Sequence, residues 1–231
     1  EQNKRNGEKT MRDLIQHEQF ELEVLDRLNS GRFLTNLVFG GGTMLRLCHG
    51  LDRFSVDLDF WVTKDFDEAT YYRKIEKYLL QFYTLADSTH KHFTILFELK
   101  SPQFPRALKI EIRKEAKIIK TETCIAYGAN SNIQVLIKTV ALEEMMKSKI
   151  EAFLSRKEIR DAYDIEFLLK KGIALPAENE ILGKLLAGLA KLGKKDFSVK
   201  LGTLLDASVR QYYIENGFRI LEMRLRDKIM P

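Results

Sequence analysis

The chain has 231 residues, 45% of them hydrophobic, so it can bury one good core or two small ones. Lysine and arginine exceed aspartate and glutamate by 38 to 33, and the resulting net charge of +5 suits a polyanionic partner but is too small for a histone-like tail. No segment reaches the roughly 18–20 continuous apolar residues of a membrane span, and two cysteines are too few for a disulfide framework, so we expect a cytoplasmic protein with reduced thiols.

The first elements are a helix from Glu8 to Leu28, ended by Asn29-Ser30-Gly31, and a short apolar strand near Val38. The run Gly40–Gly42 breaks this strand, and good helix formers resume at Thr43. Glycine lets the backbone approach phosphate oxygens, and free N–H groups at a helix start attract anions. Most glycine runs are merely turns, so this one predicts an anion site only in combination with an acidic strand close by.

Residues 55–62 predict a strand with two carboxylates on one face. Its apolar side chains fall on alternate positions, so Asp57 and Asp59 share the opposite face with Ser55. Carboxylates this close repel each other unless a cation lies between them, and Mg²⁺ prefers oxygen ligands. A solvated strand face with two ordinary surface acids is the alternative. The nearby glycine turn favours a site for a metal-bound triphosphate.

A helix from about Asp67 to Phe82 and strands over 93–100 and 107–114 come next, with weaker strand candidates at 118–124 and 133–136. On the strand 107–114, Glu111 faces away from the apolar side chains. Two-metal phosphoryl transfer needs about three carboxylates, so Glu111 is the candidate third ligand; an ion pair with Lys109 or Arg113 is the alternative. The basic residues of this region could contact phosphate or form a solvated edge: Lys109, Arg113, Lys114, Lys117 and Lys120.

After Lys138 the pattern is helical to the end, and the change at this point divides the chain into 1–137 and 138–231. In the helix that begins after Ala141, Lys149 lies on the apolar face, and Asp161 and Asp164 lie on or beside the apolar stripe of the next helix. Carboxylates at such positions are seldom buried without a partner. Either Lys149, Arg156 or Arg160 pairs with these carboxylates and joins the two helices, or Lys149 and Asp161 contact a bound nucleotide.

A set of motifs runs through both parts of the chain: Gly41-Gly42-Thr43, Leu45-Arg46, Arg53, Ser55, Asp57-Leu58-Asp59-Phe60, Lys149, Ala152, Arg156 and Arg160-Asp161-Ala162-Tyr163-Asp164. Together these motifs resemble the AbiEii/AbiGii toxin family of nucleotidyltransferases, within the DNA polymerase β-like superfamily. The resemblance implies an α+β fold, with a nucleotidyltransferase domain of mixed sheet and flanking helices over 1–137 and a helical domain over 138–231.

The same resemblance implies roles for individual residues. Asp57 and Asp59 would hold Mg²⁺ or Mn²⁺, with Glu111 as the third ligand expected from strand alternation. The nucleoside triphosphate would be held by the glycine turn and its neighbours, and Lys149 and Asp161 would line the nucleotide pocket. The predicted nucleotide-binding residues are Gly41, Gly42, Thr43, Arg46, Ser55 and Lys149.

The predicted function is metal-dependent transfer of a nucleoside monophosphate to an acceptor hydroxyl, such as an RNA or tRNA 3′ end. The chain would be the toxin of a toxin–antitoxin or phage-defence system, with an antitoxin protein as partner. Two alternatives stay open. One is a kinase-like phosphotransferase that moves the γ-phosphate, and the other is a catalytically silent module that binds RNA or an antitoxin.

Overall fold

A computed structural model of the chain describes residues 2–63, 67–115, 119–176 and 178–229, with side chains from residue 7 onward. The chain divides into two compact units, Glu1–Ala141 and Leu142–Pro231, which we call the sheet unit and the helical unit. This division falls four residues after the predicted domain boundary. The assignment of a separate function to each part stays a prediction.

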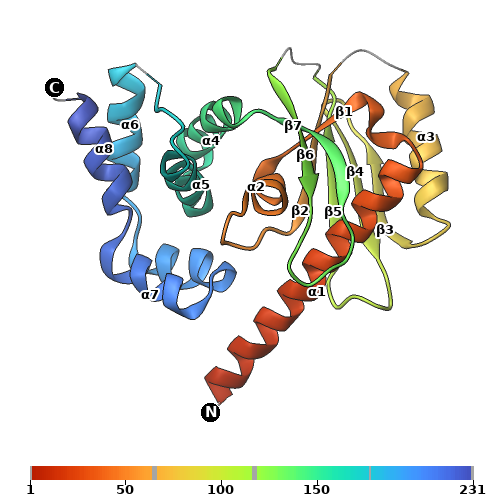
Figure 1. The fold of residues 1–231 in the computed structure, drawn as a ribbon, viewed down its shortest axis with the longest axis horizontal. Helices are drawn as coiled ribbons and strands as arrows, with labels where there is room; N and C mark the ends of the chain where they lie inside the picture. Colours follow the sequence, from red (N-terminus) through yellow and green to blue (C-terminus); the bar gives the residue numbers. More distant parts are fainter. Residues whose placement is uncertain (1, 64–66, 116–118, 177, 230–231) are drawn as a thin grey trace. The chain divides into compact units, whose positions relative to one another are not determined.

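The sheet unit combines helices with a single mixed sheet (Figure 1). Its elements in chain order are α1 (Gln2–Ser30), the 3₁₀ turn η1 (Phe33–Asn36), β1 (Leu37–Gly40), α2 (Gly41–His49), β2 (Asp57–Val62), α3 (Glu68–Leu79), β3 (Thr84–His90), β4 (Thr94–Lys100), β5 (Leu108–Arg113), β6 (Thr121–Ala126) and β7 (Val135–Val140).

The seven strands lie in the order β3-β4-β5-β2-β1-β7-β6. Strand β2 pairs antiparallel with β1 and parallel with β5, and β1 pairs parallel with β7. The two strands that carry the glycine turn and the acidic pair are therefore hydrogen-bonded neighbours inside the sheet. The remaining pairs, β3 with β4, β4 with β5 and β6 with β7, are antiparallel.

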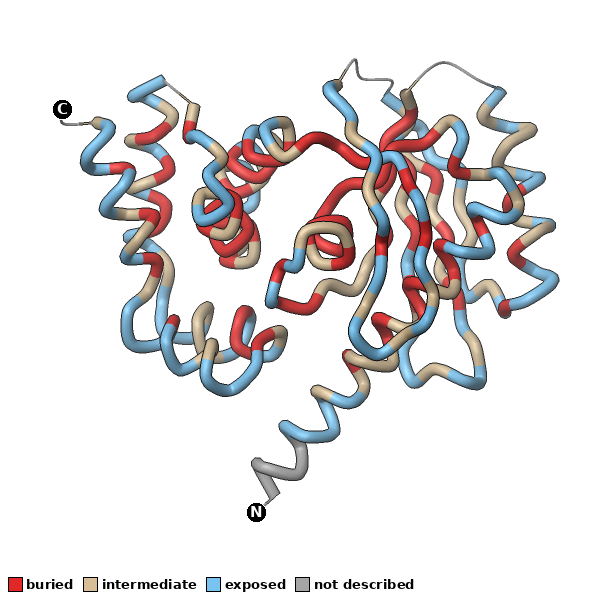
Figure 2. Tube along the Cα trace, viewed as in Figure 1, coloured by how far each residue is buried: buried red, intermediate tan, exposed pale blue. Residues whose placement is uncertain are grey.

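Alternating apolar side chains form the core of this sheet, as the sequence predicted. Leu58 and Phe60 of β2 are buried, and so are the apolar residues of the neighbouring strands β5 and β4. Helix α2 contacts β1 and β2, and Figure 2 shows it buried along most of its length. Removing this much apolar surface from water is the main stabilising contribution to the unit. The buried residues of β5 and β4 are Leu108, Ile110, Ile112, Ile95, Phe97 and Leu99.

The helical unit contains α4 (Leu142–Arg156), α5 (Ile159–Lys170), α6 (Asn179–Leu189), a π-helical turn η2 (Asp196–Leu201), the 3₁₀ turn η3 (Gly202–Leu204), α7 (Ala207–Asn216) and α8 (Arg219–Ile229). Its core includes Leu182, Leu185 and Leu189, three members of the leucine stripe predicted for α6. Among all the helices described in both units, none combines the length and the apolar character needed to cross a membrane.

Several elements differ from the expectations, beginning with α1, which starts at Gln2 and not at Glu8. Strand β3 was not predicted because it is a mostly exposed edge strand whose sequence, Thr-Leu-Ala-Asp-Ser-Thr-His, lacks an alternating apolar pattern. Strand β7 extends to Val140, so the predicted switch to helix at Lys138 was wrong by three residues. Strand β6 covers most of the predicted strand 118–124, although Ile118 lies outside the described residues, as does Lys117 of the basic run.

Candidate active site

The two aspartates of β2 lie on one face of the strand. Asp57 and Asp59 are each half-buried, and the residues between and after them, Leu58 and Phe60, are buried in the core. Because successive side chains of a strand point to opposite faces, both carboxylates lie on the face away from Leu58. The predicted alternation is confirmed from Asp57 to Phe60, but the strand begins at Asp57, so Ser55 and Val56 of the predicted strand lie before it.

The glycine turn is in direct contact with the second aspartate. Gly40 pairs with Asp59 across the β1–β2 ladder, and the next residue, Gly41, begins α2 with φ +76°. A Cβ atom placed on Gly41 would lie 2.2 Å from Asp59 Oδ2, far inside van der Waals contact. Gly41 thus lets the backbone turn with positive φ and lets the carboxylate pack against the main chain.

A cation and a hydroxyl surround the next glycine. A Cβ atom on Gly42 would lie 2.5 Å from Arg53 Nη2 and 2.8 Å from Ser55 Oγ. Arg53 is only 2% exposed, and its Nη1 donates a hydrogen bond to the carbonyl of Phe54 at 2.9 Å. Sequence reasoning included Ser55 among the site residues but not Arg53. The available signal was a charged residue in the short turn between α2 and the acidic strand.

The start of α2 has the features of an anion site. Its N-cap residue is Gly40, which offers no side chain to accept from the first N–H groups of the helix. The helix dipole adds partial positive charge at this end. Phosphate oxygens next to Gly41 and Gly42 would therefore meet backbone N–H groups, with the Asp59 carboxylate adjacent.

Glu111 lies beside Asp59 on the neighbouring strand. The two residues are directly paired in the parallel β2–β5 ladder, so their side chains share a face of the sheet. The Glu111 carboxylate lies 3.6 Å from Arg113 Nε, the ion pair considered as the alternative. Within the described ranges, no three histidine, cysteine, aspartate or glutamate residues are grouped closely enough to hold a metal ion. The third-ligand role of Glu111 stays a prediction.

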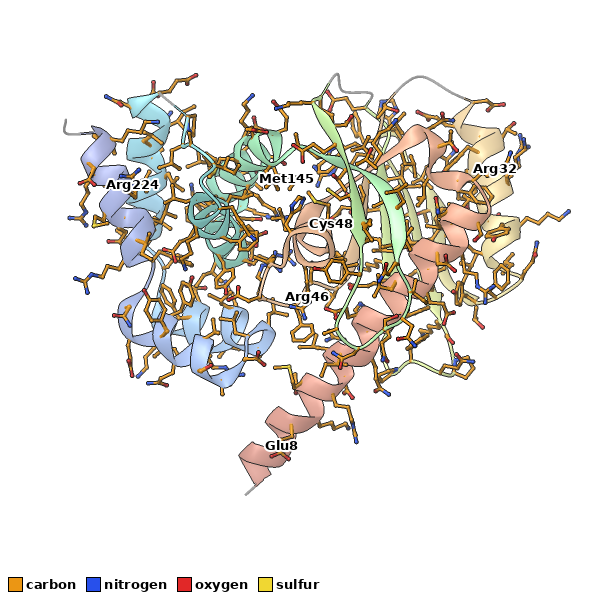
Figure 3. All side chains as sticks on the ribbon, in the orientation of Figure 1. Glu8, Arg32, Arg46, Cys48, Met145 and Arg224 are labelled. Atoms are coloured by element: carbon orange, nitrogen blue, oxygen red, sulfur yellow. The ribbon has the colours of Figure 1, made fainter. Side chains whose placement is uncertain are left out.

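The side chains of Thr43 and Arg46 are engaged inside the sheet unit. Thr43 is fully buried, and its Oγ1 donates to the carbonyl of Asp57 at 2.6 Å, so a phosphate contact by Thr43 would come from its backbone N–H. Arg46, labelled in Figure 3, pairs with Glu18 of α1 and lies 3.7 Å above the ring of Phe54. These contacts link α2 to α1, and the predicted nucleotide contact of Arg46 gains no support from them.

The charged residues predicted in the helical unit form a buried network between α4 and α5. Lys149 Nζ lies 2.7 Å from Asp164 Oδ2 and 3.5 Å from Asp161 Oδ1. Arg156 donates two hydrogen bonds of 2.6 Å to Asp161. Both aspartates are 0% exposed, and Lys149 is 7% exposed. The helix-joining interpretation accounts for these contacts, while the nucleotide-binding roles of Lys149 and Asp161 stay predictions.

The contact between Gly41 and Asp59 predicts a large effect of adding one methyl group. We expect Gly41→Ala to lower the catalytic rate of this site about 100-fold, because even a 1 Å displacement of a reacting group can cost that much. Gly50→Ala is the matched control: Gly50, at the other end of α2, also has a positive φ of +77°, but nothing lies within 4 Å of its added Cβ. Equal losses in the two variants, measured by initial rates, would contradict the importance of the Asp59 contact.

A buried acid of α1 predicts a pH effect on the stability of the protein. Glu21 is 0% exposed, and burial, with a further contribution from Glu18, raises its pKa well above the ordinary value. As the pH rises above about 4.5, Glu21 ionises in the unfolded state before it does so in the folded state. The contribution of Glu21 to the free energy of unfolding is therefore fully present at acid pH and decreases above that pH. We expect Glu21→Gln to raise the melting temperature more at pH 8 than at pH 5. An equal shift at both pH values would contradict this assignment.

Comparison with known protein families identifies the chain. The family model described as "Nucleotidyl transferase AbiEii toxin, Type IV TA system" matches residues 23–213. The chain belongs to the AbiEii family. It is therefore a nucleotidyltransferase of a toxin family, and the resemblance seen in the sequence is confirmed. The match includes β1, α2, β2 and β5, the elements that carry the candidate site.

Two solved structures from Helicobacter pylori are similar to the AbiEii-family chain. One, described as a "putative nucleotidyltransferase", is 17% identical, with 96% of each chain covered and a TM-score of 0.51. The other, JHP933, is 18% identical over 98% of this chain and 95% of its own, with a TM-score of 0.47. A search of curated proteins returned no match. The predicted mixed sheet with flanking helices and C-terminal helices is confirmed.

Proposed function

We propose that this AbiEii-family enzyme transfers a nucleoside monophosphate from a nucleoside triphosphate to an acceptor hydroxyl at an RNA end. The observation that supports this most directly is the packing of the Asp59 carboxylate against Gly41, which makes the acidic strand and the glycine turn parts of one site. The acceptor oxygen attacks the α-phosphorus, the bond to the bridging oxygen of the β-phosphate breaks, and pyrophosphate leaves.

The donor set fits a divalent cation. The two half-buried carboxylates of Asp57 and Asp59 share a strand face. Asp59 packs against Gly41, where any side chain on residue 41 would clash with the carboxylate. Asp57 and Asp59 would hold Mg²⁺ or Mn²⁺, with Glu111 beside them. When bound, the cation supplies positive charge that neutralises and orients the triphosphate.

The chain's own groups have separate tasks in this proposal. The backbone N–H groups at Gly41 and Gly42 bind phosphate oxygens, and the guanidinium of Arg53 adds fixed positive charge beside Gly42. Glu111 accepts the proton of the attacking hydroxyl at a carboxylate oxygen. Catalysis here rests on positioning and electrostatic stabilisation, as is general for phosphoryl transfer.

The choice of RNA as acceptor and of an antitoxin as partner rests on net charge and family. The net charge of +5 favours a polyanion, and the family is that of a type IV toxin–antitoxin system. The predicted basic run adds less, because Arg113 is paired with Glu111 and Lys114 lies 2.6 Å from Glu68. Net charge and family therefore support the RNA acceptor more than this basic run does.

Labelled triphosphates test the reaction type directly. Purified protein is incubated with Mg²⁺, total bacterial RNA and each α-labelled nucleoside triphosphate in turn. We expect label in one size class of RNA and none when the label is on the γ-phosphate. Label transferred from the γ-position would support the kinase-like alternative. No transfer from either position, with any triphosphate, would support a silent binding module and contradict the proposal.

A further inference from the structure

The backbone around Asp57 is held by side chains from two different helices. His17 of α1 lies with Nε2 3.0 Å from the carbonyl oxygen of Val56. Thr43 of α2 donates from Oγ1 to the carbonyl oxygen of Asp57 at 2.6 Å. Because a carbonyl can only accept, His17 Nε2 carries the proton in this bond. Two consecutive carbonyls at the start of β2 are thus bound by α1 and α2.

These two contacts lie at the start of β2, where the ladder with β1 has not yet begun. The β1–β2 ladder begins at Asp59, so Val56 and Asp57 lie beyond the end of that pairing. On the other side, Asp57 is the first residue of β2 that pairs with β5. The side chains of His17 and Thr43 are 1% and 0% exposed, so water does not compete for either bond.

We propose that His17 and Thr43 are positioning residues that fix the Asp57 carboxylate next to that of Asp59. The two hydrogen bonds determine the orientation of the peptide group on either side of Asp57, and hence the direction of its side chain. Partners that orient a metal ligand in this way typically change metal affinity or activity by about 10- to 100-fold. This inference rests on the proposed function, because it assigns Asp57 to a metal site.

A direct readout exists in the same strand. Trp61 of β2 is the chain's one tryptophan, and its ring lies so close to Gly40 that an added Cβ would be 1.4 Å from a ring carbon. Paramagnetic Mn²⁺ bound next to Asp59 should quench this fluorescence without any turnover. Titration with Mn²⁺ alone therefore measures metal binding separately from catalysis.

The test compares variants that keep or remove each donor. Thr43→Val keeps the shape of the side chain but removes the hydroxyl, and Thr43→Ser keeps the hydroxyl. His17→Leu removes the N–H donor, and His17→Gln offers an amide N–H in its place. We expect Thr43→Val and His17→Leu to weaken Mn²⁺ binding about 10- to 100-fold. Thr43→Ser and His17→Gln, which keep a donor, should bind Mn²⁺ almost as tightly as the unaltered protein.

The outcomes separate the inference from the function on which it rests. If Thr43→Val and His17→Leu lower the melting temperature but bind Mn²⁺ like the unaltered protein, the two residues are structural and the inference is overturned alone. If the unaltered protein shows neither Mn²⁺ quenching nor nucleotidyl transfer, the proposed function fails. Circular dichroism shows whether each variant is folded. Where Thr43→Val or His17→Leu does not fold, the Mn²⁺ affinity of the conservative variant at the same position is compared with that of the unaltered protein.

Discussion

Replacing Asp59 by asparagine is expected to reduce nucleotidyl transfer roughly a thousandfold or more, which corresponds to about 4 kcal/mol in the activation barrier. Asparagine keeps the size of the side chain next to Gly41 but removes the negative charge that would hold a divalent cation. The side chain is half-buried on the polar face of β2, so the fold should survive. Initial rates of label incorporation into RNA measure the effect, and thermal unfolding measures stability.

Asp87→Asn is the matched control for this prediction. Asp87 is an exposed aspartate on the edge strand β3, three strands away from β2 in the sheet. Its replacement removes the same charge and should leave the rate unchanged. Asp57→Asn should behave like Asp59→Asn. Full activity in either of these two variants would contradict the assignment of the acidic pair to the catalytic site.

The acidic strand and the glycine turn were predictable because both depend on local geometry. Alternation along β2 determines that Asp57 and Asp59 share a face, whatever the rest of the chain does. Glycine at position 41 indicates a turn that a side chain would hinder, and the structure gives it a positive φ. The close contact between Gly41 and Asp59 needs only that β1 and β2 pair as neighbours, which their short connection favours.

The environment of the site was less predictable because it depends on distant parts of the chain. The pairing of Asp59 with Glu111 requires the parallel alignment of β2 with β5, about 50 residues later in the sequence. The inward hydroxyl of Thr43 and the pairing of Arg46 with Glu18 depend on how α2 packs against β2 and α1. Helical periodicity alone does not show whether a side chain contacts a phosphate or another residue of the same chain.

The helical unit shows the same limit for charged residues. Periodicity placed Lys149 on the inner face of α4, and it is buried there. Three cations were considered as partners of the aspartates, and the structure uses Lys149 and Arg156. The Nε atom of the third, Arg160, is buried without a hydrogen-bond partner in the part of the chain that the structure describes. Which cation pairs is decided by side-chain packing between helices, which sequence spacing does not encode.

This network predicts a large loss of stability from a single change. Lys149→Met should lower the free energy of unfolding by about 3–5 kcal/mol, because it leaves the fully buried Asp164 without the ammonium group 2.7 Å away. Lys147→Met is the matched control on the same helix. Its side chain is 60% exposed and pairs with Glu144 at the surface, so the change should cost less than about 1 kcal/mol. Urea denaturation of the full chain measures both.

A double variant separates stability from nucleotide binding. Asp164→Asn removes the buried charge that loses the Lys149 ammonium group in Lys149→Met, so the combined variant should regain much of the lost stability. If Lys149 also contacts the nucleotide, as the family resemblance implies, nucleotidyl transfer is lost in Lys149→Met and is not recovered in the more stable double variant. If transfer returns together with stability, Lys149 acts only by joining α4 to α5, and its predicted place in the nucleotide pocket is wrong. An unchanged stability in Lys149→Met would contradict the buried network itself.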